Sequence, residues 1–138
     1  MNVNVNVSVS VNVNGFPVRV LHQCLRMYYR NLDVYRKALN FLPIASSVAD
    51  AMPPRYASLA DQVRRAALSI LLNIAEGSGK TSEPDKRRFY AIARGSAMEC
   101  GAILDACESL NVCTGTASTE GQALLTGIVQ MLTKLCRD

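Results

Sequence analysis

Residues 62–80 read QVRRAALSILLNIAEGSGK, and this stretch predicts a helix that is apolar on two opposite faces. At 100° per residue, one face is the stripe of an ordinary amphipathic helix, made of Leu59, Val63, Ala66, Ala67, Ile70 and Ile74. Leu68 and Leu72 lie on the other face, among charged residues. A helix at a protein surface needs only one apolar stripe. The second stripe therefore predicts a second packing partner, either within the chain or from another copy of it.

The composition is that of a helical domain. The chain has 138 residues, which favours one domain with a sizeable core. Hydrophobic residues make up 49% and aromatic residues 6%, and the alanine and leucine of the second half favour helices over sheets. The net charge of +4 permits binding to nucleic acid without requiring it, since a solvated surface often carries such an excess.

The sequence does not indicate a disulfide-rich, metal-binding or membrane protein. The cysteines number 5 and lack C-x-x-C spacing, which argues against a disulfide framework and a zinc site. We expect Cys100 and Cys107 to be buried free thiols in a reducing cytosol. The sole histidine, His22, lies near the N-terminus. No apolar run could span a membrane and no signal-peptide pattern is present. We therefore expect a cytoplasmic protein without metal, cofactor or membrane contact.

The N-terminus differs from the rest of the chain. Residues 1–15 read MNVNVNVSVSVNVNG, and the alternation of valine with asparagine or serine formally predicts a strand. No partner strand is predicted, so a low-complexity tail with some tendency to self-associate is the better interpretation. We divide the chain into a flexible, low-complexity tail over residues 1–26 and a helical domain over residues 27–138.

Helical patterns fill the remaining sequence. The predicted segments run from Leu32 to Met52, from Ser58 to Glu76, from Ser82 to Leu110, and from Thr119 to the C-terminus. The glycines of residues 77–79 end the second segment, and Ser82 caps the third. Thr119 and Gln122 form a capping box for the last. Short connections between these segments predict an all-α, antiparallel up-and-down four-helix bundle.

The same periodicity predicts the core. The first helix contributes Val34, Ala38, Phe41, Ala45, Val48, Ala49 and Met52. The third contributes Phe89, Ile92, Ala93, Ser96, Cys100, Ile103, Cys107 and Leu110, and the fourth contributes Leu124, Ile128, Met131 and Leu135. Pro43 lies opposite the core face, where it should bend the first helix rather than end it.

Several motifs resemble one bacterial family. They are the stretch over residues 62–80, the pattern Phe89-x-x-Ile92-Ala93-x-Gly95-Ser96-x-x-Glu99 and the opening Leu32-Asp33-Val34-Tyr35-x-Lys37-Ala38. From Asn31 onward the chain resembles the four-helix-bundle family encoded in intervening sequences of 23S ribosomal RNA genes. The motif residues that we take as structural are Asn73, Gly77, Gly79, Gly95 and Ser96. Leu71 and Lys86 depart from the family pattern, and Leu71 should straighten the second helix where members often have proline.

The resemblance says little about biochemical activity and more about assembly and partners. Many members of this family have no assigned activity. The family is similar to the accessory variability determinant proteins of diversity-generating retroelements, which form pentameric barrels and bind nucleic acid and a reverse transcriptase. By this analogy the chain is a ring-forming, non-enzymatic adaptor. Its implied partners are its own copies in a pentamer, RNA or DNA, and a reverse transcriptase.

Basic residues are the local evidence for nucleic-acid binding. The candidates are Arg64, Arg65, Lys80, Lys86, Arg87, Arg88 and Arg94. These side chains can contact phosphates without reading bases. The alternative is a solvated face with local ion pairs, from Asp61 to Arg64 or Arg65 and from Glu83 to Arg87. Arg55, Tyr56 and Tyr90 are weaker candidates for stacking on single strands.

Polar residues at the end of the second helix have a structural interpretation. We expect Asn73 to satisfy backbone groups of the turn, and Glu76 to pair with an arginine across an interface formed with Leu68 and Leu72. No nucleophile or histidine accompanies them, which disfavours catalysis. Gly95 and Ser96 should allow two helices to approach closely.

A phosphate-binding loop is also disfavoured. Gly79-Lys80-Thr81 resembles the end of such a loop, but Ile74 occupies the position of its first glycine and a helix precedes it. Two functions stay open. The first is a homo-oligomeric adaptor for RNA or DNA. The alternative is a protein-interaction module that docks a partner through Leu68 and Leu72 and binds no nucleic acid.

Overall fold

The described part of the protein consists of helices joined by short turns. The computed structural model describes residues 27–113 and 115–137, so the predicted tail over residues 1–26 and His22 within it lie outside the described residues. The elements are the 3-10 helix η1 (Tyr28–Asn31), α2 (Asp33–Asp50), the 3-10 helix η2 (Pro54–Tyr56), α3 (Ala57–Ser78), α4 (Glu83–Ser109) and α5 (Thr116–Arg137). This order confirms the predicted all-α fold class.

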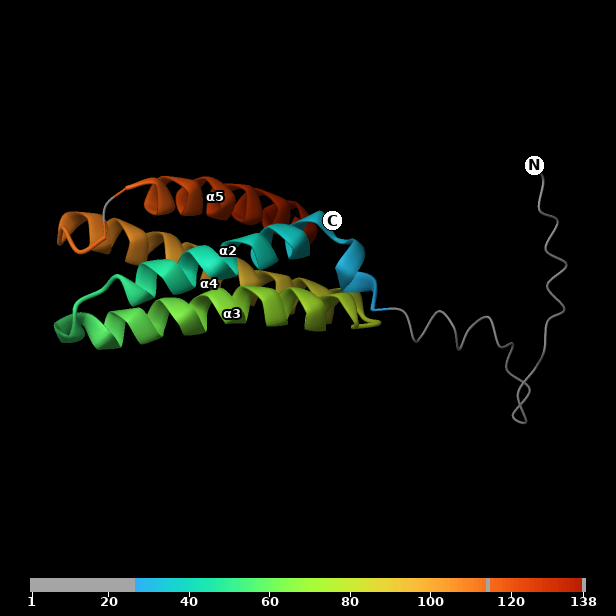
Figure 1. The fold of residues 1–138 in the computed structure, drawn as a ribbon. Helices are drawn as coiled ribbons and strands as arrows, with labels where there is room; N and C mark the ends of the chain where they lie inside the picture. Colours follow the sequence, from blue (N-terminus) through green and yellow to red (C-terminus); the bar gives the residue numbers. More distant parts are fainter. Residues whose placement is uncertain (1–26, 114, 138) are drawn as a thin grey trace, which may run out of the picture.

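The long helices form an up-and-down bundle. α2, α3, α4 and α5 pack as successive neighbours and α5 closes against α2, while the backbones of the diagonal pairs stay further apart among the described residues. Figure 1 shows the start of α2 and the C-terminus at the same end of the bundle. Because neighbouring helices are antiparallel, the end of α3 and the start of α4 also lie at this end. No helix in the described ranges is both long and apolar enough to cross a membrane.

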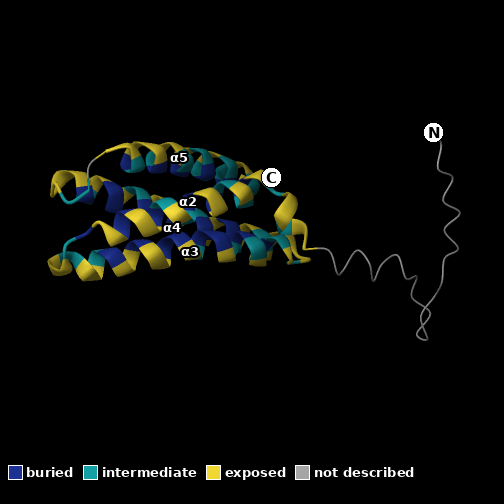
Figure 2. Cartoon of the chain, viewed as in Figure 1, coloured by how far each residue is buried: buried dark blue, intermediate teal, exposed yellow. Residues whose placement is uncertain are grey.

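The core lies along the inner faces of the helices (Figure 2). Every core residue predicted for the first helix is buried: Val34, Ala38, Phe41, Ala45, Val48 and Ala49 on α2, and Met52 just after its end. Pro43 lies inside α2 on its exposed side, as predicted. On α3 the buried set includes Val63, Ala66, Ala67, Ile70 and Ile74. The alternation of apolar and polar residues is sharp on these two helices, and their core faces follow from it directly.

The predicted core faces of α4 and α5 are partly wrong. Ile92 and Leu110 are exposed and Phe89 is half-buried, whereas the structure buries Tyr90, Ala97 and Leu104. On α5 the predicted residues Leu124, Met131 and Leu135 are half-buried, and Leu125 and Leu132 join Ile128 in the interior. Each newly buried residue follows a predicted one by a single position, a rotation of about 100°. α4 packs against both α3 and α5, so its buried arc is centred between two neighbours.

Both ends of α4 are fixed by local hydrogen bonds. Ser82 caps the start as predicted, because its hydroxyl accepts the backbone N–H of Asp85 at 3.2 Å. At the other end Asn111 has φ of 53°, and its N–H donates to the carbonyl of Glu108 at 3.0 Å. The N–H of Val112 reaches back to the carbonyl of Cys107 at 2.9 Å. These paired bonds form a Schellman motif with asparagine in the left-handed position.

The predicted capping box at Thr119 and Gln122 is wrong. α5 begins at Thr116, directly after Gly115 with φ of 128°. The side-chain amide of Gln122 donates to the carbonyl of Gly101 at 3.1 Å and to the carboxylate of Asp105 at 2.7 Å. Gln122 therefore joins α5 to α4 instead of capping its own helix.

Candidate functional site

The outward face of α3 exposes two leucines. Leu68 is 46% exposed and Leu72 is 56% exposed, so no described residue of the chain buries them. Ile92 of α4, also exposed, extends this face. The hydroxyls of Ser69 and Ser96 lie 2.9 Å apart across the α3–α4 contact, and the antiparallel register then places Ile92 at the level of Leu72. We call Leu68, Leu72 and Ile92 the outer apolar surface.

The arginines beside this surface are already paired. The guanidinium of Arg64 donates to the carboxylate of Asp50 on α2 at 2.6 Å. Nε of Arg65 donates to the carboxylate of Asp61, one turn earlier on α3, at 2.8 Å. The predicted local pair from Asp61 is thus confirmed for Arg65, whereas Arg64 bonds across helices. These pairs reduce the charge that α3 presents beside Leu68 and Leu72.

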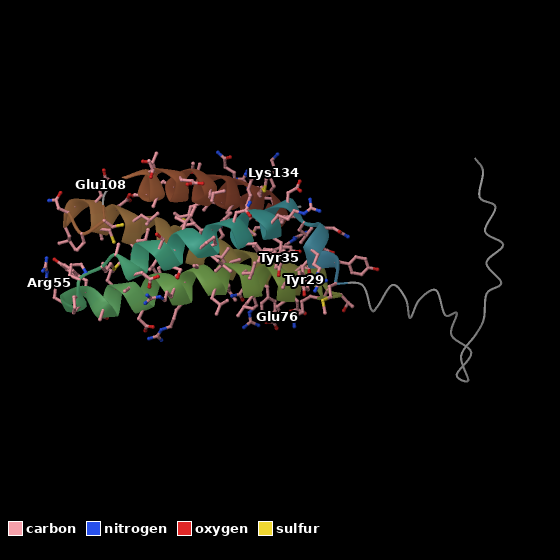
Figure 3. The ribbon with its side chains drawn as sticks, viewed as in Figure 1. Tyr29, Tyr35, Arg55, Glu76, Glu108 and Lys134 are labelled. Carbon is pink, nitrogen blue, oxygen red and sulfur yellow. The ribbon has the colours of Figure 1, made fainter. Side chains whose placement is uncertain are left out.

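Basic side chains gather instead at one end of the bundle. We call this the basic end; its cations are Arg30, Arg36, Lys37, Lys80, Lys86, Arg87, Arg88, Lys134 and Arg137. They come from η1, the start of α2, the α3–α4 turn, the start of α4 and the end of α5. Cys136 and the backbone of Arg87 approach within 3.9 Å, which ties the end of α5 to the start of α4. Figure 3 shows Lys134 and Glu76 at this end, and Arg55 and Glu108 at the other.

The acids of the basic end are engaged locally. Asp33 pairs with Arg36 at 3.3 Å, Glu76 with Lys80 at 3.2 Å and Glu83 with Lys86 at 2.7 Å. The hydrogen bond from Lys86 lowers the pKa of the Glu83 carboxyl, and the same contact raises the pKa of Lys86. Glu83 bonds directly to Lys86, and the nearby charge of Arg87 also lowers the pKa of the Glu83 carboxyl.

Cations are left over after this pairing. Within the described ranges, Arg30, Lys37, Arg88, Lys134 and Arg137 take part in no ion pair. The alkyl chain of Lys37 lies against Gly127 of α5, with Nζ 3.5 Å from the position of a Cβ there. The basic end therefore carries a net positive charge.

The structure brings only part of the predicted basic set together. Lys80, Lys86, Arg87 and Arg88 gather at the basic end, but Arg64 and Arg65 lie in the first half of α3. From Arg64 to the end of α3 at Ser78 the helix rises about 21 Å, well beyond one screening length. Arg94 is half-buried on α4, away from that end.

The sequence analysis missed four cations of the basic end: Arg30, Lys37, Lys134 and Arg137. These residues lie far apart in the chain, and only the antiparallel topology collects them. The signal that could have found them is the helix order itself, because an up-and-down bundle brings alternate helix ends together.

Candidate stacking residues also change. Tyr90 is only 7% exposed, and burial raises the pKa of its hydroxyl, so it is closed to a ligand. Arg55 lies over the ring of Tyr56, 5.0 Å from its centroid, at the end opposite the basic end. Lys80 lies over the ring of Phe89 at 4.7 Å and thus has an internal aromatic partner.

The cysteines are structural in this fold. Cys100 and Cys107 are buried free thiols, as predicted. Burial raises the pKa of Cys100 to about 12 and also raises the pKa of Cys107. Both thiols therefore stay protonated and poorly nucleophilic. Among the described residues, no group of three or more histidine, cysteine, aspartate or glutamate side chains could hold a metal ion.

Comparison with known proteins places the chain in a family. The family model described as 23S rRNA-intervening sequence protein matches residues 30–134. The chain belongs to this family. The match begins inside η1 and covers α2, α3, α4 and most of α5. A search of curated proteins found no match to the chain.

The family motif residues have distinct structural roles. The amide of Asn73 donates to the carbonyl and the hydroxyl of Ser69 at 2.8 and 3.1 Å, so its predicted role in the turn is wrong. Gly79 follows the end of α3 with φ of −86°, an ordinary helical value. Ser96 is buried, and its hydroxyl also bonds to the carbonyl of Ile92 at 3.1 Å. Glu76 pairs with Lys80 of its own chain, so an arginine across an interface is not needed to satisfy it.

The glycines of the motif differ in what surrounds them. A Cβ at Gly77 would lie 2.9 Å from Cε1 of Tyr90 and 3.1 Å from Cβ of Phe89. Gly77 therefore permits the close approach of α3 and α4. A Cβ at Gly95 would meet nothing within 4 Å, so the predicted role of Gly95 in helix approach is wrong within this chain.

This contrast predicts opposite effects for two alanine substitutions in this member of the family. Gly77→Ala should lower the free energy of unfolding by about 1 kcal/mol, because overpacking outweighs the gain in helix propensity. Gly95→Ala should raise it by up to about 1 kcal/mol. Urea denaturation followed by circular dichroism measures both. A higher free energy of unfolding in Gly77→Ala would contradict the close approach of α3 and α4, and a lower one in Gly95→Ala would contradict the open space at Gly95.

Proposed function

We propose that this protein is a non-enzymatic, homo-oligomeric adaptor that binds RNA or DNA through phosphate groups. The basic end carries the proposal. Of the described acids at this end, Asp33, Glu76 and Glu83 are in ion pairs and Asp85 accepts a hydrogen bond from the hydroxyl of Ser82 at 3.0 Å. The cations Arg30, Arg88 and Lys134 are exposed and outnumber the remaining acid, so the excess positive charge is directed at solvent. Phosphates are the polyanion that such a dispersed set of cations recognises without reading sequence. The free, buried thiols fit the reducing cytoplasm.

Self-association is the second part of the proposal. The outer apolar surface leaves Leu68, Leu72 and Ile92 exposed in a single subunit. Because Arg64 and Arg65 are neutralised by Asp50 and Asp61, a second copy could cover the leucines without burying an unpaired cation. We propose this surface as the subunit interface, with Glu76 at its edge. The pentamer and the reverse transcriptase partner rest on the family analogy.

One observation favours a different function. The same outer apolar surface could dock another protein, which would make the chain an interaction module without nucleic-acid binding. The two functions differ in what disrupts them. Partner docking would survive neutralisation of the basic end and fail in Leu68→Glu or Leu72→Glu, whereas nucleic-acid contacts depend on the charges.

A matched pair of variants tests nucleic-acid binding. We expect the triple variant Arg30→Gln, Arg88→Gln, Lys134→Gln to bind a fluorescent DNA duplex more weakly than the unchanged protein. The slope of log affinity against log salt should fall in magnitude by about 2 to 3 if each cation contacts one phosphate. Fluorescence anisotropy at several salt concentrations gives both values.

The control is the double variant Arg64→Gln, Arg65→Gln, which removes two cations that already have carboxylate partners. We expect a smaller change in affinity and in salt slope. An equal loss in both variants would relocate the contacts to α3. Absent or salt-independent binding by the unchanged protein would contradict the nucleic-acid proposal itself.

A further inference from the structure

An exposed tyrosine lies at the basic end. Tyr28 is 46% exposed and begins η1, two residues before the unpaired Arg30. Most aromatic rings of a folded domain are covered, because burial of an aromatic side chain contributes strongly to stability. The side chain of Tyr28 is instead exposed to solvent at the end of the bundle that carries the cations.

The helix that carries Tyr28 is held in place. The rings of Tyr29 and Tyr35 meet with centroids 4.7 Å apart, and the N–H of Leu32 donates to the carbonyl of Tyr29 at 3.0 Å. The N–H of Arg30 donates to the carbonyl of Met27 at 3.1 Å, which closes the turn around Tyr28. η1 contacts both α2 and α3. Figure 3 shows Tyr29 and Tyr35 beside each other at the end of the bundle where Glu76 lies. The backbone that carries Tyr28 is thus held in place before any ligand arrives.

We infer that the basic end binds single-stranded nucleic acid, with an unpaired base stacked on Tyr28 and the adjoining phosphates on Arg30 and its neighbouring cations. This inference rests on the proposed function and names its ligand class. A positively charged surface with exposed aromatic groups is the combination that holds single strands without sequence preference. Internal bases of a duplex are stacked on one another, so they offer no free face to a tyrosine. A protein partner would need acidic groups to match these cations. In that case Tyr28 would contribute to binding of the protein and not to binding of an oligonucleotide.

The test compares two probes of equal length on the full chain. One is a fluorescein-labelled oligothymidylate 20-mer, and the other is a labelled 20-base-pair DNA duplex. Tyr28→Ala should weaken binding to the single strand about tenfold or more and change duplex binding less than about twofold. Tyr28→Phe keeps the ring and should bind the single strand as the unchanged protein does. Leu110→Ala is the matched control, because Leu110 is 48% exposed at the opposite end of the bundle.

Each outcome supports or overturns the inference. A selective single-strand loss in Tyr28→Ala, restored in Tyr28→Phe, supports it. Unchanged single-strand binding in Tyr28→Ala overturns it, as does an equal loss on both probes. If salt-dependent binding persists in those cases, the proposed function still stands. Failure of both probes to bind the unchanged protein would overturn the proposed function as well. Circular dichroism should show equal helix content for all variants, because Tyr28 lies outside the long helices.

Discussion

Phe41→Ala should lower the free energy of unfolding by about 3–5 kcal/mol, the range for removing a buried aromatic side chain. Phe41 is fully buried in the middle of α2. A Cβ at Gly121 on α5 would lie 3.4 Å from Cε2 of Phe41 and 3.3 Å from Cγ2 of Ile44. The phenyl ring therefore packs into space that Gly121 leaves open.

Urea denaturation at one fixed protein concentration measures this loss, because self-association would otherwise shift the apparent stability. The midpoint should fall by about 2 M for a slope near 1.5–2 kcal/mol per M. Leu39→Ala is the matched control on the same helix, since Leu39 is exposed, and it should change the stability by less than about 0.5 kcal/mol. Equal midpoints for the two variants would contradict the assignment of the α2 core face.

The core faces show how far sequence patterns reach in this fold. On α2 the apolar residues form one stripe and polar residues fill the rest, so Val34, Phe41 and Val48 could be assigned to the interior directly. On α4 small and apolar residues cover a wide arc. Phe89 and Tyr90 are then equal candidates. Both lie against Gly77, but it is the ring of Tyr90 that packs there and is buried. Which of the two residues is buried depends on the neighbouring helix, and the periodicity of one helix carries no information about that neighbour.

Tertiary hydrogen bonds explain other differences. Gln122 has the spacing of a capping residue relative to Thr119, but the carbonyl of Gly101 and the carboxylate of Asp105 bind its amide. Arg64 has Asp61 within reach along its own helix, yet it bonds to Asp50. A local rule identifies a possible partner. It cannot compare that partner with one supplied by another helix.

In the candidate site, too, local sequence patterns predict some features, and others depend on tertiary structure. Exposure of Leu68 and Leu72 could be predicted because their apolar stripe lies opposite the core face of α3. The basic end could be predicted only in part, since Lys86 and Arg88 are close in sequence whereas Arg30 and Lys134 join them through topology. Tyr28 carried no pattern at all, and only its exposure beside Arg30 makes it a candidate.

Under the proposed self-association, Leu72→Glu should convert the oligomer to a species with the mass of one chain. Within a single subunit the change is mild, because Leu72 is 56% exposed and glutamate is a good helix former. Glu76 one turn later adds only a small like-charge repulsion. In an interface the new carboxylate would be buried without a partner, since Arg65 is held by Asp61. Burial of an unpaired charge costs several kcal/mol at every contact, enough to dissociate a typical assembly.

Light scattering after size exclusion measures the mass, and Met98→Glu provides the matched control. Met98 is still more exposed, at 63%, but it lies beside a groove lined by Leu125 and Val129 of α5, away from α3. Met98→Glu should keep the assembly intact. Dissociation by Met98→Glu alone would move the interface to the α4–α5 side, and a single-chain mass for the unchanged protein would contradict self-association altogether.

The same variant links assembly to ligand binding. Leu72→Glu leaves every cation of the basic end in place, so each subunit should keep its own phosphate contacts. The proposed ring would present several basic ends to one strand, so its loss should weaken binding to a long oligonucleotide far more than to a short one. Equal weakening on both lengths would show instead that Leu72 lies close to the nucleic acid. Unchanged affinity on the long strand, in a variant shown to be dissociated, would show that a single subunit is the binding unit.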